Sequence, residues 1–541
     1  MPAIFGDHMV LQQEIKLPVW GTADPDEAIT VTAGTHTAGV KAGPDGAWRV
    51  DLDPFPNGAA PVTLTVTGRN TVKFNDVLIG DVWICSGQSN MQLAMHEVYD
   101  GAAELAKADD PQLRLFRPDK VHSLTPMNDL PGKWFVSSSN TAWAFSAAGY
   151  FFGRELRARI NRPIGMIGIY VGGTPAQAWT SLDALQKDPA FKPYVDQYQQ
   201  ANANYPAESQ AYAVQMAAYT AAKKDWDEKY GKDFNDRLKE WTTAASAAYA
   251  AGLPNPPYPK PKLSPPKKPA EPGGGWRTAS VLFNGMVRPL IPYGLKGVIW
   301  YQGEDNVPDS QLYPGLFSTL IADWRQRWSE GNFPFLFVQI ANFNQHPKED
   351  WPLLREAQLK TALSVPNTAM VVTIDIGLPE NIHPVDKLDV GLRLALAAEN
   401  LAYGQKVIYS GPIYDSMTVQ GSAIRIKLSN TGSGLKIGAP PWVGPRSTVP
   451  PRDHLSGFVI AGEDKKWTVA DARIDGDSVV VSSPKVAAPV AVRYGWDNAP
   501  VCNLYNRENL PASPFRTDAW AESPQAPPVT PVTTASAAPA H

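Results

Sequence analysis

Ser89 lies in the short segment Ser86-Gly87-Gln88-Ser89-Asn90, which directly follows the apolar run VLIGDVWIC at residues 77–85. That run predicts a buried strand, and small and amide residues mark its end. A serine in such a place can act as a nucleophile if a base lies within hydrogen-bond reach and N–H donors stand ready for the developing oxyanion. Ser89 is therefore a candidate nucleophile for acyl transfer.

Polar or glycine residues end three further predicted strands. These ends are Gly172-Gly173-Thr174 after 163–171, Gln302-Gly303-Glu304-Asp305-Asn306 after 295–301, and Glu380-Asn381-Ile382-His383 after 368–377. The carboxyl ends of parallel strands share one edge of a sheet, where ligands bind. The four ends together offer a serine, a histidine, acids to orient it and donors for an oxyanion. We expect them to form one site.

His383 is the preferred base among the eight histidines. Two of them have a carboxylate three residues earlier, His122 with Asp119 and His383 with Glu380. His122 lies away from any predicted strand end, whereas His383 lies between the last apolar strand and the last helix. Each motif alone also has a purely structural explanation, as a turn serine, a strand terminator or a helix cap, so the prediction depends on their combination.

Two other hydrolase patterns are missing from the sequence. The segment Gly87-Gln88-Ser89-Asn90-Met91 lacks the second glycine of a G-x-S-x-G elbow. Neither an H-E-x-x-H motif nor a Cys/His cluster is present. We therefore expect no metal and no cofactor.

The order of predicted elements indicates an α/β protein with attached β segments. Residues 1–76 read as short strands, and residues 77–400 alternate buried strands with amphipathic helices, which favours a parallel sheet. An insertion at about 185–275 combines a helical hairpin with a proline-rich return arm. Residues 405–515 again read as strands, and the Pro/Ala/Thr-rich tail 522–541 is typical of disorder.

Composition excludes several partners. The chain has 541 residues, 43% of them hydrophobic and 19% charged, and a net charge of −4, which argues against nucleic acid. No apolar run reaches the ~20 residues of a membrane helix. The two cysteines, Cys85 and Cys502, cannot form a disulfide framework, and Cys85 reads as a buried free thiol. The oligomeric state stays open.

These motifs together resemble the SGNH (GDSL-like) hydrolases, and within them the sialate O-acetylesterase-type carbohydrate esterases. The resemblance spans about residues 1–400 and is carried by GDVWICSGQSNMQ, FSAAGYFFGRELRARINRPIGMIGIYVGGTPAQAW, LFNGMVRPLIPYGLKGVIWYQGEDN, FPFLFVQIANF, LREAQ and IHP. It implies a flavodoxin-like three-layer core flanked by β-sandwich-like modules. It also implies a serine O-acetylesterase that forms an acetyl-enzyme.

The resemblance assigns roles residue by residue. Ser89 would be the nucleophile and His383 the base. The oxyanion hole would be formed by the Ser89 N–H, Gly172 or Gly173, and the Gln302 side chain. The superfamily usually has Asp three residues before the histidine, where this chain has Glu380, so Glu380 is the first choice for the orienting acid and Glu304 the second. A Ser-His pair helped by a backbone carbonyl is a third alternative.

The expected substrate is an O-acetylated oligo- or polysaccharide, either xyloglucan, xylan or pectin, or O-acetyl sialic acid. Residues expected to contact the sugar are Gln88, Asn90, Trp179 and Asn306, and Trp276, Trp300 and Trp351 are further aromatic candidates. A periplasmic or secreted location is expected from the resemblance and from a start that looks leader-trimmed. Two alternatives stay open, a catalytically weak carbohydrate-binding protein and a short-chain lipase or thioesterase.

Overall fold

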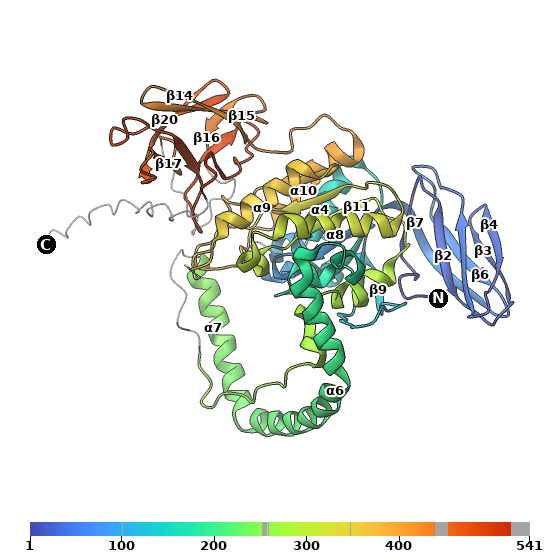
Figure 1. The fold of residues 1–541 in the computed structure, drawn as a ribbon. Coiled ribbons are helices and arrows are strands. Elements are labelled where there is room, and N and C mark those ends of the chain that lie inside the picture. The colour runs from blue at the N-terminus through green and yellow to red at the C-terminus, as the bar shows by residue number, and fades with distance from the viewer. Residues whose placement is uncertain (100, 251–256, 258, 347, 439–452, 521–541) are drawn as a thin grey trace.

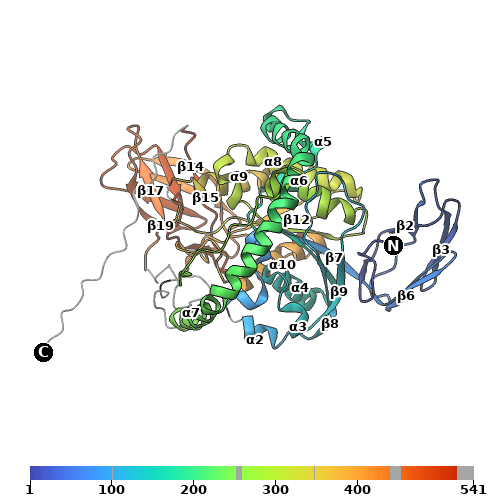
Figure 2. The same ribbon diagram turned by 90° about the horizontal axis from the view of Figure 1, so that it is seen from below.

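The computed structural model describes the chain except for residues 100, 251–256, 258, 347, 439–452 and 521–541. A central α/β unit lies between a group of N-terminal strands and a group of C-terminal strands, and a long helical arm extends from it (Figure 1). Figure 2 shows from a second direction that the two groups of strands lie on opposite sides of the central unit. The predicted tail 522–541 falls outside the described residues.

The central sheet has the strand order β13-β12-β11-β7-β10-β8-β9, and every neighbouring pair is parallel except β8 and β9. Without the β8–β9 hairpin, the order β10-β7-β11-β12-β13 follows the flavodoxin-like 2-1-3-4-5 pattern. The chain order reverses beside β7, so a ligand site is expected at the carboxyl ends of β7 and β11. The strands are β7 (Thr71–Gly87), β8 (Asp110–Pro118), β9 (Gly132–Ser137), β10 (Ile164–Tyr170), β11 (Gly297–Tyr301), β12 (Phe335–Val338) and β13 (Thr368–Val371).

Helices cover both faces of this sheet. On one face, α4 (Ala147–Ile160) and α10 (Leu388–Tyr403) pack against Trp83 and Cys85 of β7. On the other face, α8 (Tyr313–Trp328) packs against Ile84, and α9 (Trp351–Ser364) packs beside α8. Because successive side chains of a strand point to opposite faces, the apolar run of β7 supplies both cores at once.

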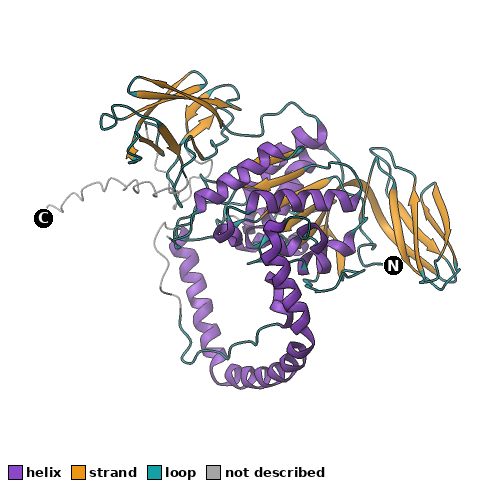
Figure 3. Ribbon diagram, in the orientation of Figure 1, coloured by secondary structure: helices purple, strands orange, loops and turns teal. Residues whose placement is uncertain are grey.

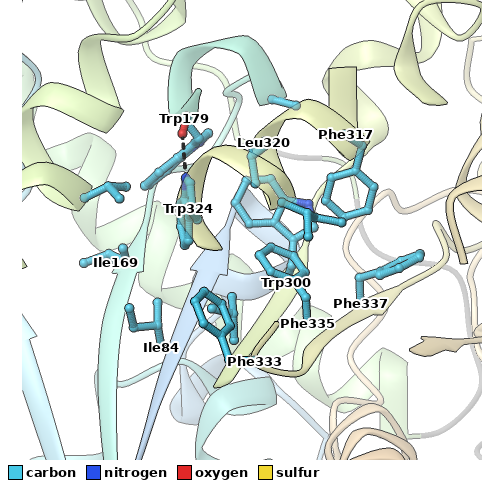
Figure 4. Packing of buried hydrophobic residues seen from close by; sticks show 14 of the residues in the cluster. Ile84, Ile169, Trp179, Trp300, Phe317, Leu320, Trp324, Phe333, Phe335 and Phe337 are labelled. Atoms are coloured by element: carbon cyan, nitrogen blue, oxygen red, sulfur yellow. Dashed lines mark hydrogen bonds between the residues drawn. The ribbon is translucent and has the colours of Figure 1, made fainter. Parts of the chain in front are cut away.

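Aromatic side chains fill the core under α8. Trp300 on β11 lies beside both Trp179 and Trp324, with ring centroids 6.0 and 6.1 Å away in edge-on arrangements (Figure 4). The indole N–H of Trp324 donates a 3.0 Å hydrogen bond to the main-chain carbonyl of Trp179. This packing fixes the loop that follows β10, which carries Trp179.

The N-terminal strands are not separated from the sheet by a linker. They are β1 (Val10–Gln12), β2 (Leu17–Thr22), β3 (Ala28–Ala33), β4 (His36–Lys41), β5 (Ala47–Leu52) and β6 (Val62–Thr67). The first part of β7 pairs antiparallel with β6, and its second part pairs in parallel with β10 and β11. The predicted boundary at residue 76 therefore falls inside one continuous 17-residue strand.

The C-terminal strands form two four-stranded antiparallel sheets, β14-β15-β20-β19 and β18-β17-β21-β23, and a pair, β16-β22. A guanidinium N–H of Arg355 on α9 donates to the Asp497 carbonyl at 2.7 Å, which ties them to the core. The strands are β14 (Ile413–Gln420), β15 (Ala423–Ser429), β16 (Leu435–Ile437), β17 (Phe458–Ala461), β18 (Thr468–Val469), β19 (Asp471–Asp475), β20 (Ser478–Ser482), β21 (Ala491–Tyr494), β22 (Leu504–Asn506) and β23 (Phe515–Arg516).

The arm consists of α6 (Lys192–Trp226), a π-helical turn (Asp227–Gly231) and α7 (Lys232–Ala250), followed by the proline-rich return (Figure 3). The return is fastened to α6 at two points. The Trp226 indole donates to the Leu263 carbonyl at 2.8 Å, and the Gly273 N–H donates to Glu208 at 2.8 Å. On α6 the two points, Glu208 and Trp226, lie eighteen residues apart, which is about 27 Å along a helix. On the return they are Leu263 and Gly273, ten residues apart, which is about 31 Å in an extended proline-rich chain. The return therefore has the length needed to run alongside this part of α6.

The remaining helices are short. They are α1 (Ser89–Gln92), α2 (Gly101–Leu105), α3 (Ser139–Ala142) and α5 (Leu182–Leu185). None of the helices in the described residues has the length and hydropathy to cross a bilayer. Cys85 and Cys502 are both buried and are not joined to each other.

Candidate active site

Ser89 is the first residue of α1, immediately beyond the carboxyl end of β7 and next to the end of β11. The turn depends on Gly87, which has φ +136° and whose added Cβ would lie 2.1 Å from the Tyr301 carbonyl oxygen. The next N–H, that of Gln88, donates a 2.9 Å hydrogen bond to the same carbonyl. The chain therefore leaves the sheet sharply at Gly87 and presents Ser89, which is partly exposed, at the expected edge.

The Gly172-Gly173 loop lies directly beside Ser89. A Cβ added to Gly172 would lie 3.3 Å from the Ser89 Cβ. The N–H groups of Ser89 and Gly173 have no hydrogen-bond partner within the described part of the chain, whereas the Gly172 N–H donates to Gln92 Oε1 at 2.9 Å. Two main-chain donors next to the Ser89 hydroxyl can therefore receive an oxyanion, and Gly172 supplies the close approach rather than a free donor.

Gln302 does not match its predicted role. Its side chain is fully buried, and its amide donates to Asn306 Oδ1 at 2.7 Å and to the Thr174 carbonyl at 3.3 Å. Its Oε1 accepts from the Tyr313 hydroxyl at 2.9 Å. Because both amide hydrogens are already used, Gln302 has no donor to offer an oxyanion and instead supports the loop that carries Thr174.

Asn90, the residue after Ser89, connects three segments. Its amide N–H₂ donates to Glu304 Oε1 at 2.6 Å and to the Ile382 carbonyl at 2.9 Å, and its Oδ1 accepts from Lys387 Nζ at 3.0 Å. Burial raises the pKa of the Glu304 carboxyl, and the hydrogen bond from Asn90 partly offsets this. The turn that carries His383 is thereby held against the turn that carries Ser89.

His383 is half-buried in that turn. Its main-chain N–H donates to Asn381 Oδ1 at 2.9 Å, and its ring makes no hydrogen bond within the described ranges, to Ser89 or to any acid. Burial lowers the pKa of the His383 imidazole, the nearby charge of Lys387 lowers it further, and the carboxylate of Glu97 acts in the opposite direction. A depressed pKa favours the neutral ring that a general base requires.

The predicted orienting acids are not joined to His383. Glu380 lies exposed at the tip of a tight turn closed by the pairing of Leu378 with Asn381, and its carboxylate makes no hydrogen bond or ion pair with His383. Glu304 is buried and is engaged by Asn90 instead. Neither acid is hydrogen-bonded to His383 among the described residues, so the acid remains a prediction; Glu304 is connected through Asn90 to the carbonyl of Ile382, the residue before His383.

Three charged or polar residues of the site escaped sequence reasoning. The first is Lys387, whose amine lies between the two turns. The second is Gln92, whose Oε1 accepts hydrogen bonds from the Gly172 N–H and, at 2.7 Å, from Lys120. The third is Glu97, whose carboxylate charge raises the pKa of His383. Gln92 lies one helical turn after Ser89, a spacing that would have indicated a shared face. The other two become recognisable only when the turns meet in space.

The four predicted sugar contacts are all buried. Gln88, Asn90, Trp179 and Asn306 expose 3%, 1%, 0% and 0% of their surface. Gln88 Oε1 accepts from the Asp305 N–H, and Trp179 donates to the Thr174 hydroxyl. These residues build the walls of the site, and stacking of a sugar on Trp179 is excluded because its ring is fully buried.

Of the further tryptophans considered, Trp300 and Trp351 are also buried, whereas Trp276 is partly exposed. Trp276 packs against the His122 ring at 4.3 Å. Its neighbour Arg277 donates to the Gly173 carbonyl at 3.1 Å and pairs with Asp305. The place where the arm returns to the core therefore lies at the rim of the Ser89 site.

Comparison with known proteins gives one family. Residues 79–243 and 275–400 match the carbohydrate esterase, sialic acid-specific acetylesterase family, and the break at 244–274 contains the proline-rich return. Sialate O-acetylesterase of Rattus norvegicus is 29% identical over 94% of this chain and 92% of its own length, and that of Homo sapiens is 28% identical over 94% and 90%.

A solved carbohydrate acetylesterase from Xanthomonas citri is 34% identical in sequence and superposes with a TM-score of 0.75. The superposition covers 96% of this chain and 99% of that one. The similarity thus extends through the N- and C-terminal strands as well as the central sheet. The chain belongs to the sialic acid-specific acetylesterase family of carbohydrate esterases, which are carboxylic ester hydrolases.

Proposed function

We propose that this protein is a serine O-acetylesterase of the SGNH type that removes acetyl groups from O-acetylated sugars through an acetyl-enzyme on Ser89. The observation that carries the proposal is the position of Ser89 at the reversal point of the sheet, beside two unengaged N–H donors and with its neighbour Asn90 bonded to the turn of His383. The strands before β7 and after α10 would then be β-sandwich-like modules attached to the catalytic core.

The reaction follows from these groups. The Ser89 Oγ bonds to the acetyl carbonyl carbon while its proton passes to the neutral His383 ring, and the carbonyl electrons move to the oxygen, which the N–H groups of Ser89 and Gly173 stabilise. The ester bond to the sugar breaks, and the sugar oxygen takes the proton from His383. Water then attacks the acetyl-enzyme in the same manner, and acetate leaves.

The sugar is proposed from the relatives and from the rim of the site. Relatives are sialate O-acetylesterases and a carbohydrate acetylesterase, so O-acetyl sialic acid and an acetylated plant polysaccharide (xyloglucan, xylan or pectin) are the two candidate classes. The partly exposed Trp276 offers an aromatic face beside the Gly172-Gly173 loop. A polymeric substrate would place the enzyme in the periplasm or outside the cell.

The test compares wild type with Ser89→Ala for acetate release from acetylated xyloglucan and from O-acetyl sialic acid. Release from either substrate that falls about 10⁴-fold or more in the variant supports the proposed nucleophile. Equal release by both proteins would contradict it. His383→Ala should lose activity to a similar extent, since the two residues act as a unit.

The second candidate function is a catalytically weak carbohydrate-binding protein, which is favoured by the lack of an acid hydrogen-bonded to His383 among the described residues. Labelling of Ser89 by a fluorophosphonate probe separates the two, because an unactivated serine should stay unlabelled. A short-chain lipase or thioesterase is distinguished by p-nitrophenyl esters, since an acetylesterase should lose activity as the acyl chain lengthens.

A further inference from the structure

Lys387 is a fully buried lysine that the proposed chemistry leaves unused. It precedes α10 and exposes 0% of its surface. Its Nζ donates a 3.0 Å hydrogen bond to Asn90 Oδ1 and another to the Pro384 carbonyl oxygen. Burying an ammonium group is costly unless it is paired and hydrogen-bonded, so its place between these two turns calls for a functional explanation.

The two acceptors belong to the neighbours of the proposed catalytic residues. Asn90 follows Ser89 in sequence, and Pro384 follows His383. One amine is therefore bonded at the same time to the turn that presents the nucleophile and to the turn that presents the base. Since Ser89 and His383 are not themselves hydrogen-bonded in the described part of the chain, the distance between them depends on such bridges.

We propose that Lys387 is a positioning residue that joins the Ser89 turn to the His383 turn and sets its charge beside the His383 ring; this rests on the proposed function of Ser89 and His383. The amine acts through Asn90 and through the main chain of Pro384, and it does not contact the substrate. A displacement of a catalytic group by about 1 Å can cost about 100-fold in rate, so loss of this bridge should be felt mainly in kcat.

The electrostatic part of the proposal involves a small set of charges. The Lys387 amine faces the carboxylate of Glu304, which lies in the segment after β11, and that of Asp386, which lies in its own turn. It also lies 5.4 Å from the centroid of the Tyr301 ring. His383 is acted on by Lys387, which opposes its protonation, and by Glu97, which favours it. Burial lowers the pKa of the Lys387 amine to about 7, so the amine carries charge over the acidic range in which His383 titrates.

Three variants separate the hydrogen bonds from the charge. Lys387→Met removes both, Lys387→Gln keeps a donor without the charge, and Lys387→Arg keeps donors and charge. Lys360→Met, which removes an exposed lysine of α9 paired with Glu356, is the matched control. Folding of every variant is checked by near-UV circular dichroism and thermal unfolding, so the glutamine and arginine variants decide the question if the methionine variant does not fold.

Two readouts are measured. The first is kcat and KM for p-nitrophenyl acetate across the acidic range, and the second is the pH titration of the His383 ring by NMR of ring-labelled histidine, assigned with His383→Asn. We expect Lys387→Met to lower kcat about 100-fold with KM changed by less than about threefold. In the methionine and glutamine variants the His383 pKa should rise, and in the arginine and Lys360→Met proteins it should stay near that of wild type.

Folded methionine and glutamine variants that retain kcat within about twofold and an unchanged His383 titration would overturn the proposal and leave Lys387 a packing residue. Failure of the proposed function looks different, because wild type would then show no Ser89-dependent hydrolysis. In that case the NMR titration tests only the electrostatic part of the proposal, and the positioning role of Lys387 in catalysis is overturned together with the proposed function.

Discussion

The side-chain amide of Asn90 donates a 2.9 Å hydrogen bond to the main-chain carbonyl oxygen of Ile382. These residues lie 292 positions apart in the chain, and each is the immediate neighbour of a proposed catalytic residue. The serine turn and the histidine turn are therefore held together by their neighbours, which leaves Ser89 Oγ and the His383 ring free of bonds within the described residues and available to a substrate.

Asn90→Ala should damage both stability and catalysis. It removes the hydrogen-bond donor to the Ile382 carbonyl and to Glu304 Oε1, and it takes one of two acceptors from the Lys387 amine, which keeps the Pro384 carbonyl. The site is closed to water, since Asn90 exposes only 1% of its surface. Each unsatisfied buried group costs about 1–3 kcal/mol, so we expect urea unfolding to show a loss of about 2 kcal/mol or more, together with a fall in kcat on p-nitrophenyl acetate.

The control for this variant is Asn202→Ala, an exposed position on α6, which should change the free energy of unfolding by less than about 0.5 kcal/mol. Equal stability and equal kcat in Asn90→Ala and wild type would contradict the bridging role of Asn90.

The sheet and the edge that carries the site could be predicted from the sequence, because buried parallel strands read as continuous apolar runs and end in glycine and polar residues. Ser89 and Gly173 are examples, since each lies directly beyond such a run. The burial and the hydrogen-bond partners of Gln302, Asn90 and Trp179 could not be predicted, because the partners come from other strands and loops. Residue type alone suggested donors and stacking faces where the structure has satisfied, buried groups.

Glu380→Gln should leave kcat within about twofold of wild type. The Glu380 carboxylate is exposed at the tip of its turn and makes no hydrogen bond or ion pair among the described residues, so it has no means of orienting the His383 ring. The measurement is kcat and KM on p-nitrophenyl acetate beside those of Glu380→Ala. A loss of about 10⁴-fold, as expected for a true triad acid, would show that Glu380 turns inward during catalysis.

The acidic limb of kcat/KM should lie below the ordinary histidine value of about 6.5, because burial and the charge of Lys387 lower the pKa of His383. The base must be neutral, so activity falls only as the pH drops through this lowered pKa. The Glu97 carboxylate raises the pKa of His383, and Glu97→Gln should therefore move the limb to still lower pH. A limb that moves upward in Glu97→Gln would reverse the assigned sign.

Gly87→Ala should destabilise the protein strongly. The added Cβ would lie 2.1 Å from the Tyr301 carbonyl oxygen, and the backbone there has φ +136°. Gly421→Ala is the matched control, with φ +63° and no atom within 4 Å of the added Cβ, so it carries backbone strain alone, about 1 kcal/mol. We expect Gly87→Ala to lower the free energy of unfolding in urea by about 3 kcal/mol or more. Equal losses in the two variants would show that the backbone at Gly87 shifts to accommodate the added methyl group and that the close contact adds no destabilisation.

Trp276→Ala should weaken binding of an acetylated polysaccharide without affecting a small ester. Trp276 is partly exposed, and the next residue, Arg277, donates to the Gly173 carbonyl, so the ring stands at the rim where a sugar chain would extend from the acetyl site. Loss of an aromatic contact of about 1 kcal/mol should raise KM for the polymer about fivefold, while kcat/KM for p-nitrophenyl acetate stays near wild type.

The matched control is Trp20→Ala, which removes a partly exposed tryptophan of β2 and should change neither value. An equal loss on both substrates in Trp276→Ala would instead mean that the ring supports the catalytic groups, through Arg277 and the Gly172-Gly173 loop, since a change in the oxyanion donors affects every ester alike.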